Sequence, residues 1–225
     1  AVPKPTNAPK AGQIPFYKAG QHSSPTHYID RFEVYEQITN GTFEAVTNEI
    51  VSAHRSGIAD GFKTISKKDY QADKLRSLSS VVFSGADRSI DSNTYHTEIL
   101  NADIDSNTPA ELRALMDCVK AGQVAWIEFA ALSVSGSITG SMWANFRVQM
   151  PAKPSHVPAT IYRRLGIDAK QPFSEIIKEL HTAYGKALKH LFSKEGIVLG
   201  GHNLKMPRNL THDAGAYLNR NASTF

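Results

Sequence analysis

The strongest constraint on the fold of this chain is a nine-residue segment, 142–150, in which every second side chain is apolar. The apolar positions are Met142, Ala144, Phe146, Val148 and Met150, and between them lie Trp143, Asn145, Arg147 and Gln149. A period of two predicts a β-strand with one buried and one solvated face. The nearly continuous apolar run at 124–134 predicts a more central strand, and the Ser-Gly-Ser sequence at 135–137 predicts a hairpin turn between the two.

Two segments have both the apolar spacing and the end signals of amphipathic helices. Thr108 and Glu111 form a capping box at the start of the first, and Gly122 follows its end. The second, at about 173–194, has Ser174 as its cap and one broad apolar face. Each is therefore predicted to have one buried face.

Other parts of the chain are less regular. A further helix is predicted from Thr42 to Gly57, whereas residues 28–38 fit either a strand or a helix, with a slight preference for the helix. Residues 58–106 consist of short apolar pieces from which no topology can be derived. The first 25 residues contain five prolines, a composition that favours extended polyproline II segments.

These patterns predict an α+β fold. We expect a mainly helical core with one β-hairpin or small antiparallel sheet at about 124–150, flanked by an extended Pro-rich N-terminal arm and an irregular C-terminal tail. The expected boundaries are 1–27 for the arm, 28–196 for a single globular core and 197–225 for the tail. The arm has three basic and no acidic residues, the tail has a net charge of +2, and the core is close to neutral.

Several classes of function lack their motifs. Cys118 is the only cysteine, which excludes an intramolecular disulfide, and it is expected to be a packed, inert thiol. The nine histidines do not have metal-site spacing, and neither a phosphate-binding loop nor a nucleophile elbow occurs. We therefore expect no metal and no cofactor. No apolar run is long enough to cross a membrane, so a cytoplasmic location is expected, or a virion if this is a coat protein.

The best candidate for a binding surface combines aromatic and basic residues, as surfaces for single-stranded nucleic acid do. The candidate nucleic-acid-binding residues are Trp143, Arg147, Lys153, Arg163 and Arg164, with Lys205 and Arg208 as a second choice. The alternative is that these side chains are ordinary solvent-exposed residues with no binding function.

Two hypotheses of function follow. The favoured one is a structural, self-assembling protein that coats or packages nucleic acid, of the coat or nucleocapsid kind, whose arm and tail link copies of itself. The alternative is a small cytosolic enzyme, a hydrolase or transferase, with a site assembled from dispersed His, Asp and Ser residues. His54, His96 and His202 would be the first residues to test for such a site.

Overall fold

A computed structural model describes residues 9–20, 25–60, 74–83, 93–104, 108–133, 141–151, 154–194, 196–200 and 208–225. In this part of the chain, two four-stranded antiparallel sheets and a two-stranded ribbon are combined with five α-helices. The predicted mainly helical core with one hairpin is therefore wrong. Of the eight described strands that this prediction lacks, three lie wholly in the segments that were expected to flank the core, and the other five lie between residues 27 and 104.

The central sheet has the strand order β10-β7-β8-β6. Its middle is the predicted hairpin, which is confirmed: β7 (Ile127–Ser133) pairs antiparallel with β8 (Ser141–Arg147). The turn predicted at 135–137 lies outside the described residues. On the two outer sides, β6 (Ile99–Ile104) pairs with β8, and β10 (Tyr217–Leu218) pairs with β7.

The second sheet joins residues from both ends of the chain in the order β2-β1-β3-β9. Its strands are β2 (His27–Asp30), β1 (Gln13–Tyr17), β3 (Ser77–Leu78) and β9 (Arg208–Asn209). Four of the five β1 residues are buried. Pro15 has no amide hydrogen, but its carbonyl oxygen accepts a hydrogen bond from the Ser79 amide at 3.3 Å. Residues 13–17 are thus a strand of the core rather than a free arm.

The C-terminal residues are also part of the fold, where an irregular tail was expected. Three of their backbone amides donate hydrogen bonds to the central sheet or to the residues that flank its strands: Asn219 to Glu128 at 2.8 Å, Ser223 to Ala125 at 2.9 Å and Phe225 to Arg147 at 2.9 Å. The Phe225 ring meets the Trp126 ring edge to face, with 4.9 Å between centroids. Residues 208–225 therefore complete the sheets of their own chain.

Two of the five described helices begin and end where the sequence signals place them. The α-helices are α1 (Arg31–Thr39), α2 (Glu44–Asp60), α4 (Pro109–Lys120), α5 (Ala159–Leu165) and α6 (Phe173–Lys194). A short 3₁₀ turn (Pro154–His156) precedes α5, and the ribbon consists of β4 (Val81–Phe83) and β5 (Asn93–His96). Both parts of the predicted capping box of α4 are present, and the predicted range of α6 is confirmed.

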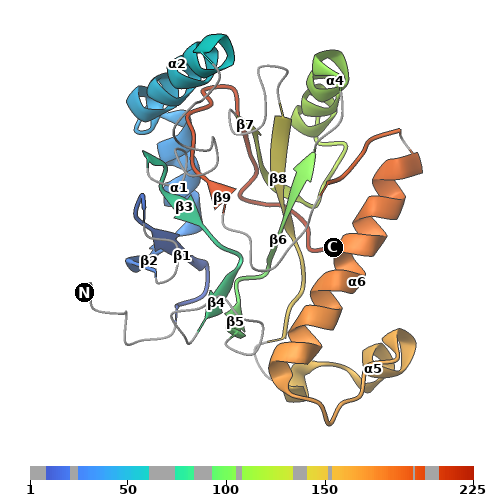
Figure 1. Cartoon of the computed structure of the whole chain (residues 1–225). Helices are drawn as coiled ribbons and strands as arrows, with labels where there is room; N and C mark the ends of the chain where they lie inside the picture. Colours follow the sequence, from blue (N-terminus) through green and yellow to red (C-terminus); the bar gives the residue numbers. More distant parts are fainter. Residues whose placement is uncertain are drawn as a thin grey trace.

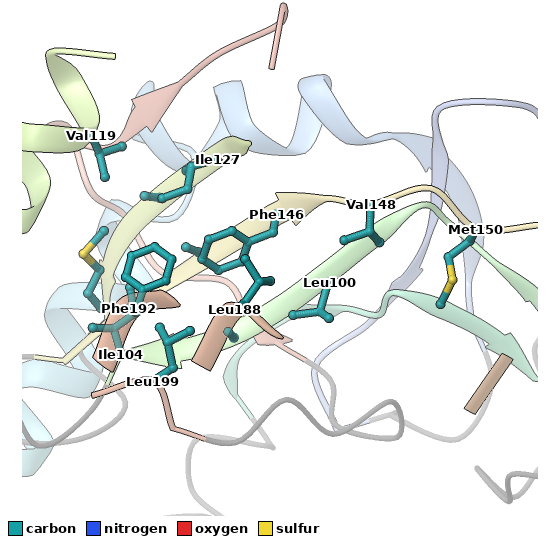
Figure 2. Close-up of a cluster of buried hydrophobic side chains, with 14 of the residues drawn as sticks. Leu100, Ile104, Val119, Ile127, Phe146, Val148, Met150, Leu188, Phe192 and Leu199 are labelled. Atoms are coloured by element: carbon teal, nitrogen blue, oxygen red, sulfur yellow. The ribbon is translucent and has the colours of Figure 1, made fainter. Parts of the chain in front are cut away.

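Both faces of the central sheet are covered (Figure 1). One face packs against α4 and α6 through a cluster that includes Leu100, Phe146 and Leu188 (Figure 2). The opposite face packs against α1 and the second sheet through residues such as Phe129 and Trp143. Full burial of each such side chain contributes about 1.5–3 kcal/mol. The core therefore consists of two apolar layers, one on each side of the central sheet.

Candidate functional site

The polar side of β8 is an interior surface, contrary to the expectation that it is solvated. Trp143 is 2% exposed and Asn145 is fully buried, because the second sheet and α1 cover them. Arg147 is half-buried, and one of its guanidinium nitrogens donates a 3.2 Å hydrogen bond to the Ala222 carbonyl oxygen. The Trp143 ring is thus not available as a surface for base stacking.

Seven polar side chains between the two sheets form one connected network. It begins at Glu128, whose Oε1 accepts hydrogen bonds from Arg31 Nε at 2.7 Å and from the Tyr35 hydroxyl at 3.0 Å. Residue pairing shifts between Ile127 and Phe129, so Glu128 is an extra residue in β7. This bulge allows its carboxylate to face α1 although both neighbouring residues are paired with β8.

The network continues across the central sheet. Asn145 Nδ2 donates to the Tyr35 oxygen at 2.8 Å, and Asn101 Nδ2 donates to Asn145 Oδ1 at 2.5 Å. Asn101 and Asn145 lie directly opposite each other in the β6–β8 register. Arg208 closes the row by donating hydrogen bonds to the side chains of Asn101 and Asp103. Arg208, predicted to contact nucleic acid, is thus engaged in the core with only 8% of its surface exposed.

Burial and neighbouring charges fix the protonation of this network. Desolvation by burial raises the pKa of Tyr35 well above its ordinary value, and the adjacent Glu128 charge raises it further. Burial opposes the charge of Arg31, but the Glu128 carboxylate outweighs this effect and raises the Arg31 pKa. At neutral pH Tyr35 and Arg31 are consequently both protonated, and Arg31 is paired with Glu128. Its enclosure suits the joining of two layers rather than the binding of a substrate.

The exposed basic residues concentrate on α5, α6 and the connection between them. Residues 159–194 contain seven basic and three acidic side chains, a net charge of +4 that equals the formal net charge of the whole chain. We call these seven residues the basic helical surface: Arg163, Arg164, Lys170, Lys178, Lys186, Lys189 and Lys194. All seven are exposed. Among the described residues, Lys178 is the only one of the seven in an ion pair, with Glu175 at 3.2 Å.

The structure separates the seven residues predicted to bind nucleic acid. Trp143 and Arg208 lie in the core, Arg147 is bonded to the C-terminal segment, and Arg163 and Arg164 are exposed on α5. Lys153 and Lys205 lie outside the described residues. Of these seven, only Arg163 and Arg164 are exposed in the part of the chain that the structure describes, and they belong to the segment 159–194, in which exposed basic residues concentrate. The lysines of α6 were not among the predicted binding residues, although their spacing at 178, 186 and 189 places them along one side of a helix.

A groove lies between α4 and the C-terminal end of α6, with a volume of about 600 Å³. Its lining includes Trp126, Leu191 and Phe192, and Cys118 contributes from α4. Cys118 is exposed, so the expectation of a packed thiol is wrong. The residue lies on the outer side of α4, whereas Leu115 and Val119 face the core. We call this feature the α4–α6 groove.

The candidate residues of the enzymatic alternative are not among the described side chains. The side chains of His54 and His96, and all of His202, lie outside this part of the structure. Within it, no group of three or more His, Cys, Asp or Glu residues could hold a metal ion. The helices described here include none with the length and apolar character needed to cross a bilayer. The exposed features that remain are the basic helical surface and the α4–α6 groove.

Comparison with known proteins identifies no relative: no protein family, no curated protein and no solved structure matches the chain. The exposed surfaces of the chain itself are therefore the basis for assigning a function.

Proposed function

We propose that this chain is a structural protein that assembles with copies of itself and coats nucleic acid, and that the basic helical surface contacts the phosphate backbone. The observation that carries the proposal is the concentration of charge: residues 159–194 have a net charge of +4, and the rest of the chain is neutral overall. Lysine and arginine side chains that are exposed and lack acidic partners are free to neutralise phosphates. The protein would then belong to a nucleoprotein particle, in the cytoplasm or in a virion.

The shape of the surface favours an extended strand. Helix α6 has 22 residues, which corresponds to a length of about 33 Å. Lys186 and Lys189 lie in the C-terminal half of α6, whereas Arg163 and Arg164 belong to α5. Helix α5 lies near the N-terminal end of α6 (Figure 1). A single strand that follows this surface would meet charges at both ends without insertion into a groove.

Binding in this mode depends on contacts with the phosphate groups rather than with the nucleobases. The tryptophan predicted to stack on bases is buried, which leaves electrostatic contacts as the main source of affinity. We therefore expect weak sequence preference and a strong dependence on salt. With so few contacts per subunit, stable coating would require many subunits on one strand.

The test is the salt dependence of binding to a fluorescein-labelled single-stranded oligonucleotide, measured by anisotropy. If Arg163, Arg164, Lys186 and Lys189 each contact one phosphate, log K falls against log salt with a slope of about −2.8. Between 50 and 200 mM salt the affinity then falls about 50-fold. The double variant Arg163→Ala/Arg164→Ala should halve the slope to about −1.4 and lose only about 7-fold over the same range.

A matched control removes the same charge elsewhere. Arg113 and Lys120 are exposed on α4, outside the basic helical surface, and their double alanine variant should keep the original slope. Equal slopes for the α5 variant and the wild-type protein would reject the assignment of Arg163 and Arg164. The absence of binding at 50 mM salt would reject the proposed function itself.

A further inference from the structure

The α4–α6 groove has the character of a binding surface for an apolar chain segment. Most of its lining is apolar: Ala114, Leu115, Val124, Trp126, Leu191, Phe192 and Ile197. The Leu191 side chain is 37% exposed at its edge, although the other face of the same helix is buried in the core. A contiguous apolar hollow lined by aromatic rings is typical of sites that bind other protein segments.

The groove has one charged side chain in its lining, Glu111. Its carboxylate accepts a 2.5 Å hydrogen bond from the Thr108 amide, and the bonds to Thr108 lower the pKa of Glu111. The carboxylate is therefore ionised at neutral pH. A matching ligand would combine apolar side chains with one positive charge.

Residues 1–8, which lie outside the described residues, have this composition. Their sequence is AVPKPTNA, with Lys4 as the one charged residue. In a polyproline II helix, with three residues per turn, Val2, Pro5 and Ala8 would share one side, and Lys4 and Asn7 would share another. Eight residues in this conformation extend about 25 Å. Grooves lined by aromatic residues commonly bind such segments, because little conformational entropy is lost on binding.

We propose that the α4–α6 groove binds residues 1–8 of a second copy of this chain, with Lys4 placed near Glu111. This proposal rests on the self-assembly that is part of the proposed function. The second sheet, which contains β1, covers one face of the central sheet, whereas α4 and α6 cover the other (Figure 1). β1, which follows this segment in the sequence, therefore lies on the side of the central sheet opposite to the groove. A neighbouring molecule can supply the segment without a path around the sheet.

The single cysteine makes occupation of the groove measurable. Cys118 lines the groove and is the only thiol in the chain, so its rate of reaction with a thiol reagent reports access to this site. A synthetic peptide with the sequence of residues 1–10 is added to a deletion variant that lacks residues 1–8 and is otherwise intact. With the peptide at tenfold its dissociation constant, nine-tenths of the grooves are filled and the reaction slows about tenfold. A scrambled peptide should not slow it, and a peptide with Lys4→Glu should bind more weakly.

A variant that blocks the groove tests the same contact in the intact chain. Ala114 is an exposed helical residue in the lining, so Ala114→Arg should fill the groove without disturbing the core. Its matched control is Ala187→Arg, at an exposed position of α6 outside the lining. Light scattering should show association that increases with concentration for the wild-type and Ala187→Arg proteins, and its loss for the Ala114→Arg and deletion variants.

The outcomes separate this inference from the proposed function. Failure of the peptide to protect Cys118, or unchanged association of both the Ala114→Arg and deletion variants, would overturn the docking of residues 1–8. If protection of Cys118 in the wild-type chain does not depend on the protein concentration, residues 1–8 bind to the groove of their own molecule. That result would overturn the proposed binding by a second copy. Oligonucleotide binding by the basic helical surface is measured independently, so its loss would leave the docking result unchanged.

Discussion

The buried ion pair between Arg31 and Glu128 leads to a quantitative prediction about stability. The two side chains are 6% and 0% exposed, and 2.7 Å separates Arg31 Nε from Glu128 Oε1. Substitution of Arg31→Met leaves a carboxylate in the interior with the Tyr35 hydroxyl as its remaining hydrogen-bond partner among the described residues. The removal of one partner from a buried pair typically costs about 3–5 kcal/mol. The total stability of a domain is about 5–15 kcal/mol, so this single change should remove a large part of it.

The assay is equilibrium unfolding in urea of the wild-type protein, Arg31→Met, Glu128→Gln and the double variant. Each single change should lower the free energy of unfolding by about 3–5 kcal/mol, whereas the double variant should lose less than the sum, because no charge then remains buried without a partner. The exposed pair between Arg220 and Glu36 provides the control. Arg220→Ala should cost at most about 1 kcal/mol.

The reasoning would be refuted if Arg31→Met and Glu128→Gln each cost less than about 1 kcal/mol, or if their effects were additive. Additivity would mean that the two groups are stabilised independently, despite their contact. The denaturant slope should be unchanged in all variants, since the area exposed on unfolding is the same.

Three further predictions concern single positions. Above pH 10 the unfolded chain loses the Tyr35 proton and the native state keeps it, because the native pKa is raised, so stability should decrease as pH rises through this range by up to about 1.4 kcal/mol per pH unit. Urea unfolding of Tyr35→Phe between pH 9 and 11 should show a smaller decrease than the wild-type protein, and an identical decrease would contradict the raised pKa. Thr108→Ala removes the bond from the Glu111 amide to the Thr108 hydroxyl and should cost about 1 kcal/mol in the same assay, whereas Thr108→Ser should be nearly neutral. Gly166 ends α5 with φ at +68°, and no atom of the described residues outside its own neighbours lies within 4 Å of the position that a Cβ would take. Gly166→Ala should therefore cost about 1 kcal/mol through backbone strain alone, and an unchanged urea midpoint would disprove this.

The sequence predicted those elements whose signals are local. The capping box at Thr108 and Glu111 marks the start of α4, and the apolar face between residues 173 and 194 marks α6. The alternation of apolar and other side chains along residues 142–150 correctly indicates a strand with two distinct faces. It does not indicate whether another layer covers the polar face, which depends on contacts with residues 13–38.

The candidate site residues show the same difference between features with a local sequence signal and features that depend on distant residues. Glu128 is the single charged residue within an apolar run, a pattern that indicates a buried, paired carboxylate, but its partners Arg31 and Tyr35 are more than 90 residues away. The exposure of Arg163 and Arg164 on α5 could be anticipated, because they follow a short apolar stretch near a glycine. The short strands β1, β9 and β10 could not, since each is held by pairing with distant residues rather than by its own sequence pattern.

The pairing of both chain ends with interior strands determines when this protein can fold during synthesis. β3 pairs on one side with β1, which is made early, and on the other with β9, which begins at Arg208. The outer side of β7 likewise pairs with β10 near the end of the chain. A ribosome-bound chain would therefore expose unpaired edges of β3 and β7 until residues 208–218 emerge, and such edges promote aggregation. Rapid synthesis of the segment between β3 and β10, or a chaperone that covers these edges, would shorten or prevent this exposure.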